Sequence, residues 1–434
     1  MDRGLKRFKK RKKDHHSSRD GAYVTRPISL EKTLKNLPPA PENNIIYFHI
    51  PYCSKICSFC NMRRGLGFPT KEYTETLLQH IKILGRQKGL QVPIDSIYFG
   101  GGTPSTLETE DIYKTLDTLY ENFPIRKDAE ISLETSLTEL SPKKLEILKN
   151  HGINRISVGV QTFSDSGRKL FQRRGTGEFA RKRLWEYRDL GFENINIDFI
   201  YNYPGEKTEE FERDLMTFKE LDLAGFSLYS LMVMPGSVME QVISKEKLSE
   251  EERIKKDMEF FQKALEIRER EGWEQLELTK IVKPGRDEYK YIRHRLNQGW
   301  TIPIGAGAGG TIGHTMFMGN IDVEKYAESV GQLLQTKGMA FKDLYFQQKA
   351  ILNPLQLGYL WKKDLEESPL LEEVKVLIDE GYFTEDKDRY YLTDIGLFWG
   401  NSISEYLWDL FPKPKKSLMT KGMMKMMGKG RTKY

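Results

Sequence analysis

Short apolar runs rich in β-branched residues alternate with amphipathic stretches of helical length from residue 45 onward. The apolar runs predict strands at 45–50, 96–101, 130–135, 155–160, 194–200 and 226–233. Helical periodicity lies between them, near 70–87, 109–121, 142–150, 178–190 and 208–220. Because buried strands that alternate with helices form a parallel sheet with both faces covered, we predict an α/β fold. Six units indicate an open, partial (β/α)6 barrel rather than a closed eightfold one.

The sequence pattern outside these strands and helices divides the chain into further segments. A charged helical stretch follows residue 250, and residues 340–411 read helix, strand, charged turn, strand, helix, which is the outline of an α-rich, winged-helix-like module. We predict these segments: a basic disordered tail (1–20), a lead-in (21–44), the partial barrel (45–250), a barrel extension and substrate-covering segment (251–335), the winged-helix-like domain (336–411), and a basic Met-rich tail (412–434).

The net charge of +6 comes from the two ends of the chain. Residues 1–18 hold eight Lys or Arg against two Asp, and residues 413–434 hold eight Lys or Arg and no acid. A nucleic-acid-binding domain carries its basic charge on a folded face, so we expect no nucleic-acid partner and interpret the ends as solvated tails. Contact with anionic lipid, RNA or an acidic partner is the alternative.

The 434 residues contain three cysteines, Cys53, Cys57 and Cys60, all in the loop after the first predicted strand. An odd, clustered set is a poor disulfide framework and is typical of a reducing compartment. No N-terminal apolar leader is visible, and no run approaches the ~18 apolar residues that span a bilayer. We therefore expect a cytoplasmic protein without a membrane span.

The spacing C-x3-C-x2-C allows three thiolates to converge on one soft metal centre. Three cysteines would bind three irons of a four-iron cubane and leave the fourth iron open to a small chelating ligand. The alternatives are a zinc site completed by His49 or another residue, and three inert thiols. Parallel sheets place their chemistry at the carboxyl ends of the strands, so this loop should lie beside the "GGTPS" loop after residue 99.

The cysteine motif resembles that of the radical S-adenosylmethionine (SAM) enzymes. The stretches "YFHIPYCSKICSFC", "YFGGGTPS", "ISLET", "RISVGVQTF", "NIDFIYNYPGEKTEEF" and "SLYSLMVMPGS" follow, in order, the pattern of the HemN-like branch, named for the oxygen-independent coproporphyrinogen oxidases. The resemblance implies a 4Fe–4S cluster on Cys53, Cys57 and Cys60, and SAM that is cleaved to methionine and a 5′-deoxyadenosyl radical. It also implies a second SAM molecule and a flavodoxin- or ferredoxin-type electron donor.

The resemblance assigns roles to further residues. Without side chains, Gly101 and Gly102 let backbone groups approach the SAM amino group. Glu134, at a strand end, would hold ribose hydroxyls, and Phe59 would stack on adenine; a surface carboxylate and core packing are the alternatives. The remaining cofactor-binding candidates are Tyr47 on the first strand and, for the second SAM, Thr103, Gln161, Arg173 and Asp198 together with Gly102. A structural ion pair is the alternative for Asp198.

Differences between this chain and some members of the HemN-like branch indicate which members it resembles most. Met62 occupies the position where the coproporphyrinogen oxidases have a further Cys, and "KPGRDEYKYIRHRLNQGW" lacks the haem-binding pattern of the haem chaperones. The stretch "PIGAGAGGTIGHTMFMGN" is similar to the ChuW/HutW/HmuW-type anaerobic haem-degrading methyltransferases, the anaerobilin synthases. This similarity implies haem as substrate, methylation by SAM, ring opening and release of iron; an oxidase or a chaperone remains open. The substrate-contact candidates are Gly307, Gly309, Arg286, Tyr289 and His314.

Overall fold

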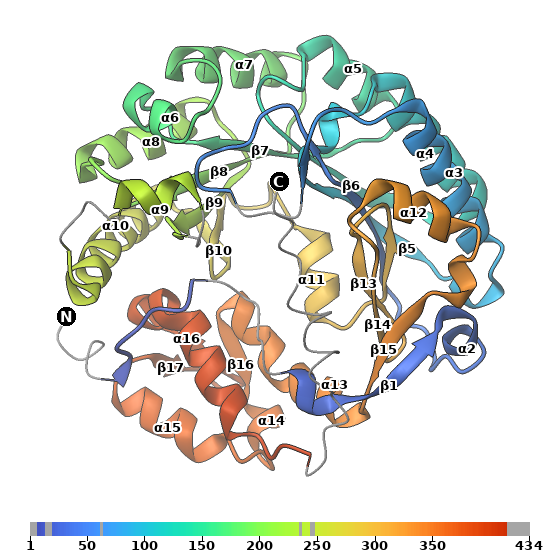
Figure 1. The fold of residues 1–434 in the computed structure, drawn as a ribbon. Coiled ribbons are helices and arrows are strands. Elements are labelled where there is room, and N and C mark those ends of the chain that lie inside the picture. Colours follow the sequence, from blue (N-terminus) through green and yellow to red (C-terminus); the bar gives the residue numbers. More distant parts are fainter. Residues whose placement is uncertain (1–6, 14–19, 61–63, 234–236, 244–247, 415–434) are drawn as a thin grey trace.

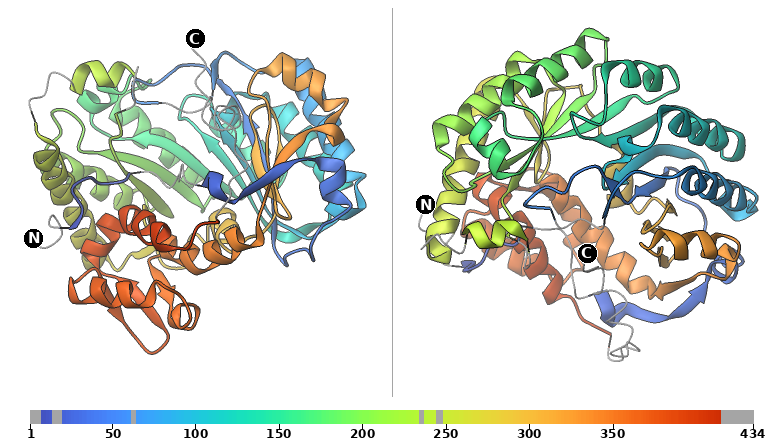
Figure 2. Two further views of the ribbon diagram at one scale, coloured as in Figure 1. Left: turned by 60° about the horizontal axis from the view of Figure 1, so that its bottom comes forward. Right: turned by 45° about the horizontal axis from the view of Figure 1, so that its top comes forward.

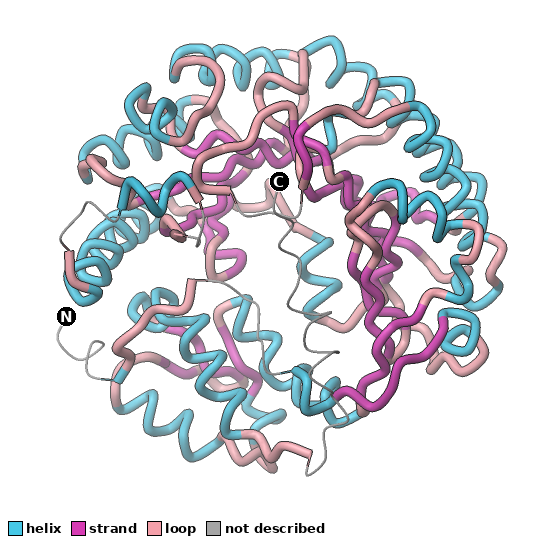
Figure 3. Tube along the Cα trace, in the orientation of Figure 1, coloured by secondary structure: helices cyan, strands magenta, loops and turns pink. Residues whose placement is uncertain are grey.

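The computed structural model describes residues 7–13, 20–60, 64–233, 237–243 and 248–414. Met62, the C-terminal methionines and most of the basic C-terminal end lie outside the described residues. The described part is built on one curved sheet with helices on its convex side and a small C-terminal module across its open side (Figure 1). Figure 3 shows the strands inside and the helices outside along most of this arc.

The main sheet has nine strands in the order β10-β11-β9-β8-β7-β6-β5-β2-β12. Seven of them, from β9 to β12 in that order, are parallel, and β11 and β10 extend the sheet antiparallel at one edge. The two edge strands β10 and β12 do not pair with each other, so the barrel is open. The bounds are β2 (Asn44–Ile50), β5 (Ile94–Gly101), β6 (Ile125–Thr135), β7 (Arg155–Gln161), β8 (Ile195–Tyr201), β9 (Gly225–Ser230), β10 (Glu274–Glu277), β11 (Lys280–Val282) and β12 (Thr301–Ile304).

The six strands predicted from the sequence are confirmed as the central six of this sheet, and the α/β class is confirmed with them. Several of the helices between them begin after a residue whose side chain accepts a bond from a free backbone N–H: Thr70 before α3, Ser141 before α5 and Thr176 before α7. These outer helices are α3 (Lys71–Gly85), α4 (Thr109–Asn122), α5 (Pro142–Asn150), α6 (Asp165–Leu170), α7 (Gly177–Asp189), α8 (Thr208–Glu220), α9 (Val238–Ile243) and α10 (Glu250–Glu271).

A second, antiparallel sheet packs at the β12 side of the barrel. Its order is β1-β15-β14-β13, so the lead-in strand pairs with a strand more than 300 residues later. The elements of this region are β1 (Val24–Ser29), α2 (Leu30–Leu34), α11 (Lys290–Leu296), β13 (Gly309–Ile312), β14 (Thr315–Met318), α12 (Val323–Val330) and β15 (Lys337–Phe341). The short pair β3 (Tyr52–Cys53) and β4 (Gly65–Leu66) flanks the cysteine loop.

The C-terminal module has the predicted winged-helix-like outline. A three-stranded antiparallel sheet, β16-β18-β17, packs with helices around a core that includes the fully buried Trp399. Its elements are α13 (Asp343–Leu352), β16 (Tyr359–Trp361), α14 (Lys362–Leu365), α15 (Leu371–Asp379), β17 (Phe383–Glu385), β18 (Arg389–Leu392) and α16 (Asp394–Leu410). Across the part of the chain that the structure describes, no helix has the length and apolarity needed to cross a membrane.

The prediction of a solvated N-terminal tail is wrong for residues 7–13. Both views in Figure 2 show this segment, in dark blue, running between α10 and α16. Arg11 contacts Asp257 at 3.3 Å and lies over the ring of Phe398, and Lys13 contacts Asp257 at 2.7 Å. Asp257 is only 1% exposed, so these two cations compensate a buried carboxylate that local composition could not disclose. Residues 1–6 and 14–19 of the predicted tail lie outside the described residues.

Candidate functional site

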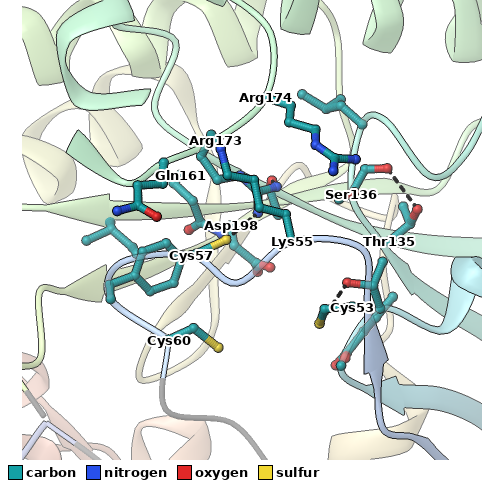
Figure 4. A pocket seen from close by; sticks show the side chains of 18 of the residues that line it. Cys53, Lys55, Cys57, Cys60, Thr135, Ser136, Gln161, Arg173, Arg174 and Asp198 are labelled. Atoms are coloured by element: carbon teal, nitrogen blue, oxygen red, sulfur yellow. Dashed lines mark hydrogen bonds between the residues drawn. The ribbon is translucent and has the colours of Figure 1, made fainter. Parts of the chain in front are cut away.

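A cavity of about 340 Å³ opens at the carboxyl ends of the parallel strands. It lies where the loop after β2 meets the loop after β5. The two strands are parallel neighbours, paired from Ile45 with Ser96 to Ile50 with Gly101, so they end at the same level. Figure 4 shows the three cysteines around one side of this opening and polar side chains from β7 and β8 behind them. The structure therefore confirms that these two loops lie side by side.

The three cysteines enter the cavity from one loop but have different surroundings. Cys53 is buried at the end of β3, and its Sγ lies 3.4 Å from Thr103 Oγ1. Cys57 Sγ accepts a hydrogen bond of 3.1 Å from Arg173, and Cys60 also lines the cavity. Burial raises the pKa of Cys53 to about 11, so this thiol would keep its proton at neutral pH unless a positively charged metal centre displaced it.

This donor set fits an iron–sulfur cluster better than a single ion. Among the described residues, no group of three or more His, Cys, Asp or Glu side chains is arranged to hold one metal ion. A cubane binds its cysteines at separate iron corners, so its ligands stand further apart than the ligands of one zinc ion. His49, the residue considered for completing a zinc site, lies 3.1 Å from the hydroxyl of Tyr47 through its Nδ1.

The glycine loop after β5 packs directly on the cysteine strand. The N–H of Gly102 donates to Ile50 O at 2.9 Å, and the N–H of Thr103 donates to Tyr52 O at 2.7 Å. A Cβ at Gly102 would stand 2.4 Å from Tyr52 O, which is closer than any real contact of this kind. Gly101 has φ +116°, a conformation that suits glycine. The glycines therefore fix the cysteine loop against the cavity as well as lining it.

Glu134 closes β6 and faces the cavity with its carboxylate already bonded. Tyr98 donates to Oε1 at 2.8 Å and the N–H of Gly101 donates to Oε2 at 3.2 Å. Burial raises the pKa of Glu134 to about 7, with these two hydrogen bonds acting in the opposite direction. A buried carboxylate in this position can accept further hydrogen bonds from ligand hydroxyls.

The far wall of the cavity carries Gln161, Arg173 and Asp198. Gln161 has φ 74°, which a residue with a side chain rarely adopts, and the β7–β8 register shifts at this point. Arg173 donates to the carbonyl of Gly159 and so links the strand end to the cysteine loop. Burial raises the pKa of Asp198, and nearby cations and the hydroxyl of Ser227 lower it again.

Most cofactor candidates therefore line a single cavity, and Tyr47 does not. Phe59 lines it while packing edge-to-face on Phe171 at 5.2 Å. Tyr47 lies deeper in the barrel, where its ring stacks on Tyr98 and Tyr291 at 6.3 and 6.0 Å between centroids. Its ring is half-buried, and its contacts are these aromatic neighbours and the imidazole of His49.

The structure places none of the substrate candidates at this cavity. Arg286 lies at the opposite end of the sheet and pairs with Asp222 at 3.5 Å, because its loop returns to the start of β9. His314 is on the β13–β14 turn, 2.7 Å from Asp343. Tyr289 is half-buried inside the barrel, with Arg155 over its ring at 4.2 Å. Gly307 packs on the ring of His49, and Gly309 packs on Met318.

Some cavity residues were missed by the candidate list drawn from the sequence. Tyr229, Ser230 and Leu231 enter from the end of β9, beside Met232. The side chain of Tyr229 is 38% exposed although β9 is otherwise buried, so its ring is open to the cavity. The predicted strand ran to residue 233, three residues past the observed end at Ser230, so the sequence pattern placed Tyr229 in the strand interior. Lys55 and Arg64 add positive charge from the cysteine loop and from the residues just after it.

Comparison with known proteins matches residues 47–218 to the radical SAM superfamily. The chain is 28% identical over 379 residues to the heme chaperone HemW of Bacillus subtilis, across 82% of this chain and 97% of that protein. It is 25% identical over 298 residues to an anaerobilin synthase of Escherichia coli O157:H7, across 68% of this chain and 67% of that protein. The solved structure of the coproporphyrinogen III oxidase HemN of Escherichia coli superposes with a TM-score of 0.72 at 22% identity, covering 87% and 92% of the two chains. The similarity to the HemN structure shows the fold alone.

Proposed function

We propose that this chain, which contains a radical SAM domain and is similar to members of the HemN-like family, acts on haem without oxygen. In this proposal a carbon derived from SAM is transferred to the porphyrin, the ring opens to a linear tetrapyrrole, and iron is released. A flavodoxin- or ferredoxin-type protein supplies the electron. The enzyme belongs, in this view, with the haem-degrading methyltransferases of the family.

A radical SAM domain uses a 4Fe–4S cluster and SAM, which together supply a 5′-deoxyadenosyl radical when bound. We assign the cluster to Cys53, Cys57 and Cys60. Gly101, Gly102 and Glu134 would bind the SAM molecule next to the cluster, with Phe59 against its adenine. The second SAM molecule would occupy the far wall, with contacts to Gly102, Thr103, Gln161, Arg173 and Asp198.

The observation that carries the proposal is the arrangement of the cavity. Three thiols from one loop face a wall with an ionisable carboxylate, Asp198, across a space that is open to the surface. The chain's own residues have definite tasks there. Arg173, on the far wall, donates a hydrogen bond to the thiol of Cys57. Near neutral pH, Glu134 either carries a proton or accepts a hydrogen bond from a ligand hydroxyl.

Haem is the proposed substrate on three grounds. The relatives named above are a heme chaperone, an anaerobilin synthase and a coproporphyrinogen oxidase, so tetrapyrroles are common to them. Met62 replaces the extra cysteine that is typical of the oxidases. The cavity combines an exposed aromatic ring, Tyr229, and a thioether, Met232, with the cations Lys55 and Arg64 at its rim. A flat apolar ring with two carboxylates needs walls and cations of these kinds.

A haem chaperone is the second candidate, and the match to HemW across 97% of that protein favours it. A chaperone would bind haem and pass it on without changing the ring. A radical coproporphyrinogen oxidase is the third candidate and would release carbon dioxide from coproporphyrinogen III.

The deciding experiment is mass spectrometry after strictly anaerobic incubation of the cluster-loaded protein with SAM, a reductant and either haem or coproporphyrinogen III. The proposal predicts an iron-free linear tetrapyrrole that is heavier by one carbon unit, together with 5′-deoxyadenosine or S-adenosylhomocysteine. A Cys57→Ala variant is the matched control and should give no product. Unchanged haem with stable binding would favour the chaperone, and carbon dioxide release from coproporphyrinogen would favour the oxidase.

A further inference from the structure

A buried lysine lies behind the far wall of the cavity. Lys280, on β11, has a side chain that is 1% exposed. Lys280 pairs in register with Ser227 on β9, and Ser227 pairs in register with Asp198 on β8. Residues in register on neighbouring strands point to the same face of a sheet. Asp198 and Lys280 therefore belong to one row of side chains on the inner face, with Ser227 between them.

Lys280 makes no hydrogen bond to the acid beside it. Asp287 accepts two hydrogen bonds from Arg155, at 2.9 and 3.0 Å, and a third from the N–H of Tyr289 at 3.1 Å. The Nζ of Lys280 lies 3.6 Å from Asp287 Oδ2, beyond hydrogen-bonding distance. Arg155 thus makes the hydrogen-bonded ion pair with Asp287, and the positive charge of Lys280 acts on both Asp287 and Asp198.

Asp198 is the acid that needs this charge. Burial raises the pKa of Asp198, and Lys280 is the largest of the charges and hydrogen bonds that lower it again, ahead of Ser227, Arg155 and Arg173. Glu134, across the cavity, also faces Asp198 and is raised in pKa by it. Lys280 itself is desolvated, which lowers its pKa to about 8; Asp287, Asp198 and Glu277 raise it, and Arg155 lowers it further.

We propose that Lys280 is a positioning residue: it keeps the carboxylate of Asp198 ionised so that this carboxylate can hold a cationic group of a ligand in the cavity. The inference rests on the proposed function, because the sulfonium and ammonium groups of SAM are the cations that the cavity would receive. Lys280 does not touch the ligand in this arrangement. It acts through Asp198, along the row formed by β8, β9 and β11.

Loss of the lysine charge has a definite consequence. A buried carboxylate without a nearby cation takes up a proton closer to neutral pH. A protonated Asp198 cannot attract a sulfonium, so SAM affinity should fall as the pH falls, by up to about tenfold per pH unit below the raised pKa. The wild-type protein is the reference at each pH, because Glu134, whose pKa burial raises to about 7, adds its own pH dependence to SAM binding in every variant.

The test measures SAM binding rather than turnover. Cluster-loaded, unreduced protein is titrated with SAM by anaerobic calorimetry at several pH values, for wild type, Lys280→Met and Lys280→Arg. We expect Lys280→Met to lose about tenfold or more in affinity between pH 8 and 6 relative to wild type, and Lys280→Arg to follow wild type because it keeps the charge. S-Adenosylhomocysteine, which has a neutral sulfur, should show a smaller difference between variants. Adding Asp198→Asn to Lys280→Met should remove the extra pH dependence.

The outcomes separate the two proposals. A Lys280→Met variant that folds and keeps the wild-type pH profile overturns the role of Lys280 and leaves the proposed function intact. A Lys280→Arg variant that behaves like Lys280→Met also overturns it, since charge would then not be the cause. Wild-type protein that binds no SAM at any pH would overturn the proposed function and this inference together. If Lys280→Met does not fold, Lys280→Gln provides the same comparison with a polar group facing Asp287.

Discussion

Replacement of Asp287 by Asn tests the charge balance inside the barrel. Asp287 has no exposed side-chain surface, and its partners Arg155 and Lys280 are each 1% exposed. Asn keeps the shape but removes the largest negative charge that acts on both cations. Glu130, 3.9 Å from Arg155, remains as a weaker partner of that cation. The carboxylates of Asp198 and Glu277 remain as weaker partners of Lys280. Breaking a buried ion pair in this way costs about 3–5 kcal/mol of unfolding free energy. We expect the Asp287→Asn variant to lose stability in that range at pH 7.

The matched control is Asp222→Asn. Asp222 also contacts three cations, Arg188, Lys283 and Arg286, but its side chain is 47% exposed. Exposed ion pairs contribute about 0–1 kcal/mol because water screens them and already solvates both partners. Denaturant unfolding followed by circular dichroism would compare the two variants with wild type. A loss below about 1 kcal/mol for Asp287→Asn, or equal losses for both variants, would refute the reasoning.

The stability loss of the Asp287→Asn variant should also depend on pH. Burial lowers the pKa of Lys280 to about 8, below the ordinary value of 10.5 that it regains on unfolding. The folded state therefore binds fewer protons than the unfolded state between these values, and this lysine's contribution to stability rises with pH. Without Asp287 the folded-state pKa should fall further, so the deficit of Asp287→Asn should shrink as the pH is raised. A deficit that is constant from pH 7 to 10 would contradict this account.

Three further predictions follow from single contacts. Gly102→Ala should weaken SAM binding by more than tenfold, because its Cβ would meet the Tyr52 backbone, whereas Gly331→Ala, with open space around it, should leave dialysis-measured binding unchanged. Burial raises the pKa of Glu206 to about 9, so wild-type stability should fall as the pH rises from about 4.5 to 9. Glu206→Gln should reduce this fall in the melting temperature by a few degrees or more. If the melting temperature of the variant depends on pH as steeply as that of wild type, Glu206 is not the source of the fall. Lys13→Met should cost about 1–3 kcal/mol because Asp257 is buried, and an unaltered melting curve would show that the N-terminal segment contributes little.

The central strands could be predicted from the sequence because their signal is local. Each is a continuous apolar run bounded by helical periodicity, and the predicted ends lie within a few residues of the observed ones. The outer strands gave no such signal. β12 has four residues, including Pro303, and pairs with β2 some 250 positions earlier in the chain. β10 and β11 are similarly short and derive their stability from the edge of the sheet.

The cavity was predictable to a similar extent. The cysteines and the glycine loop follow strands and Glu134 lies at the end of its strand, so the rule about strand ends brings them together. The backbone of Gln161 and the row from Asp198 to Lys280 depend on a register shift and on an antiparallel extension, which local patterns do not encode. The substrate candidates were chosen from stretches whose place in the fold only tertiary structure decides, and the structure puts them elsewhere.

The docked N-terminal segment also constrains when the molecule can be completed during synthesis. Arg7 contacts Glu373 and Glu380, and Lys12 contacts Glu405, so these partners leave the ribosome more than 360 residues after the segment itself. Residues 7–13 must therefore wait for these partners before their positive charges are compensated. Seating of this segment would be a late event of folding, and it would fasten the segment across the C-terminal module after the barrel has formed.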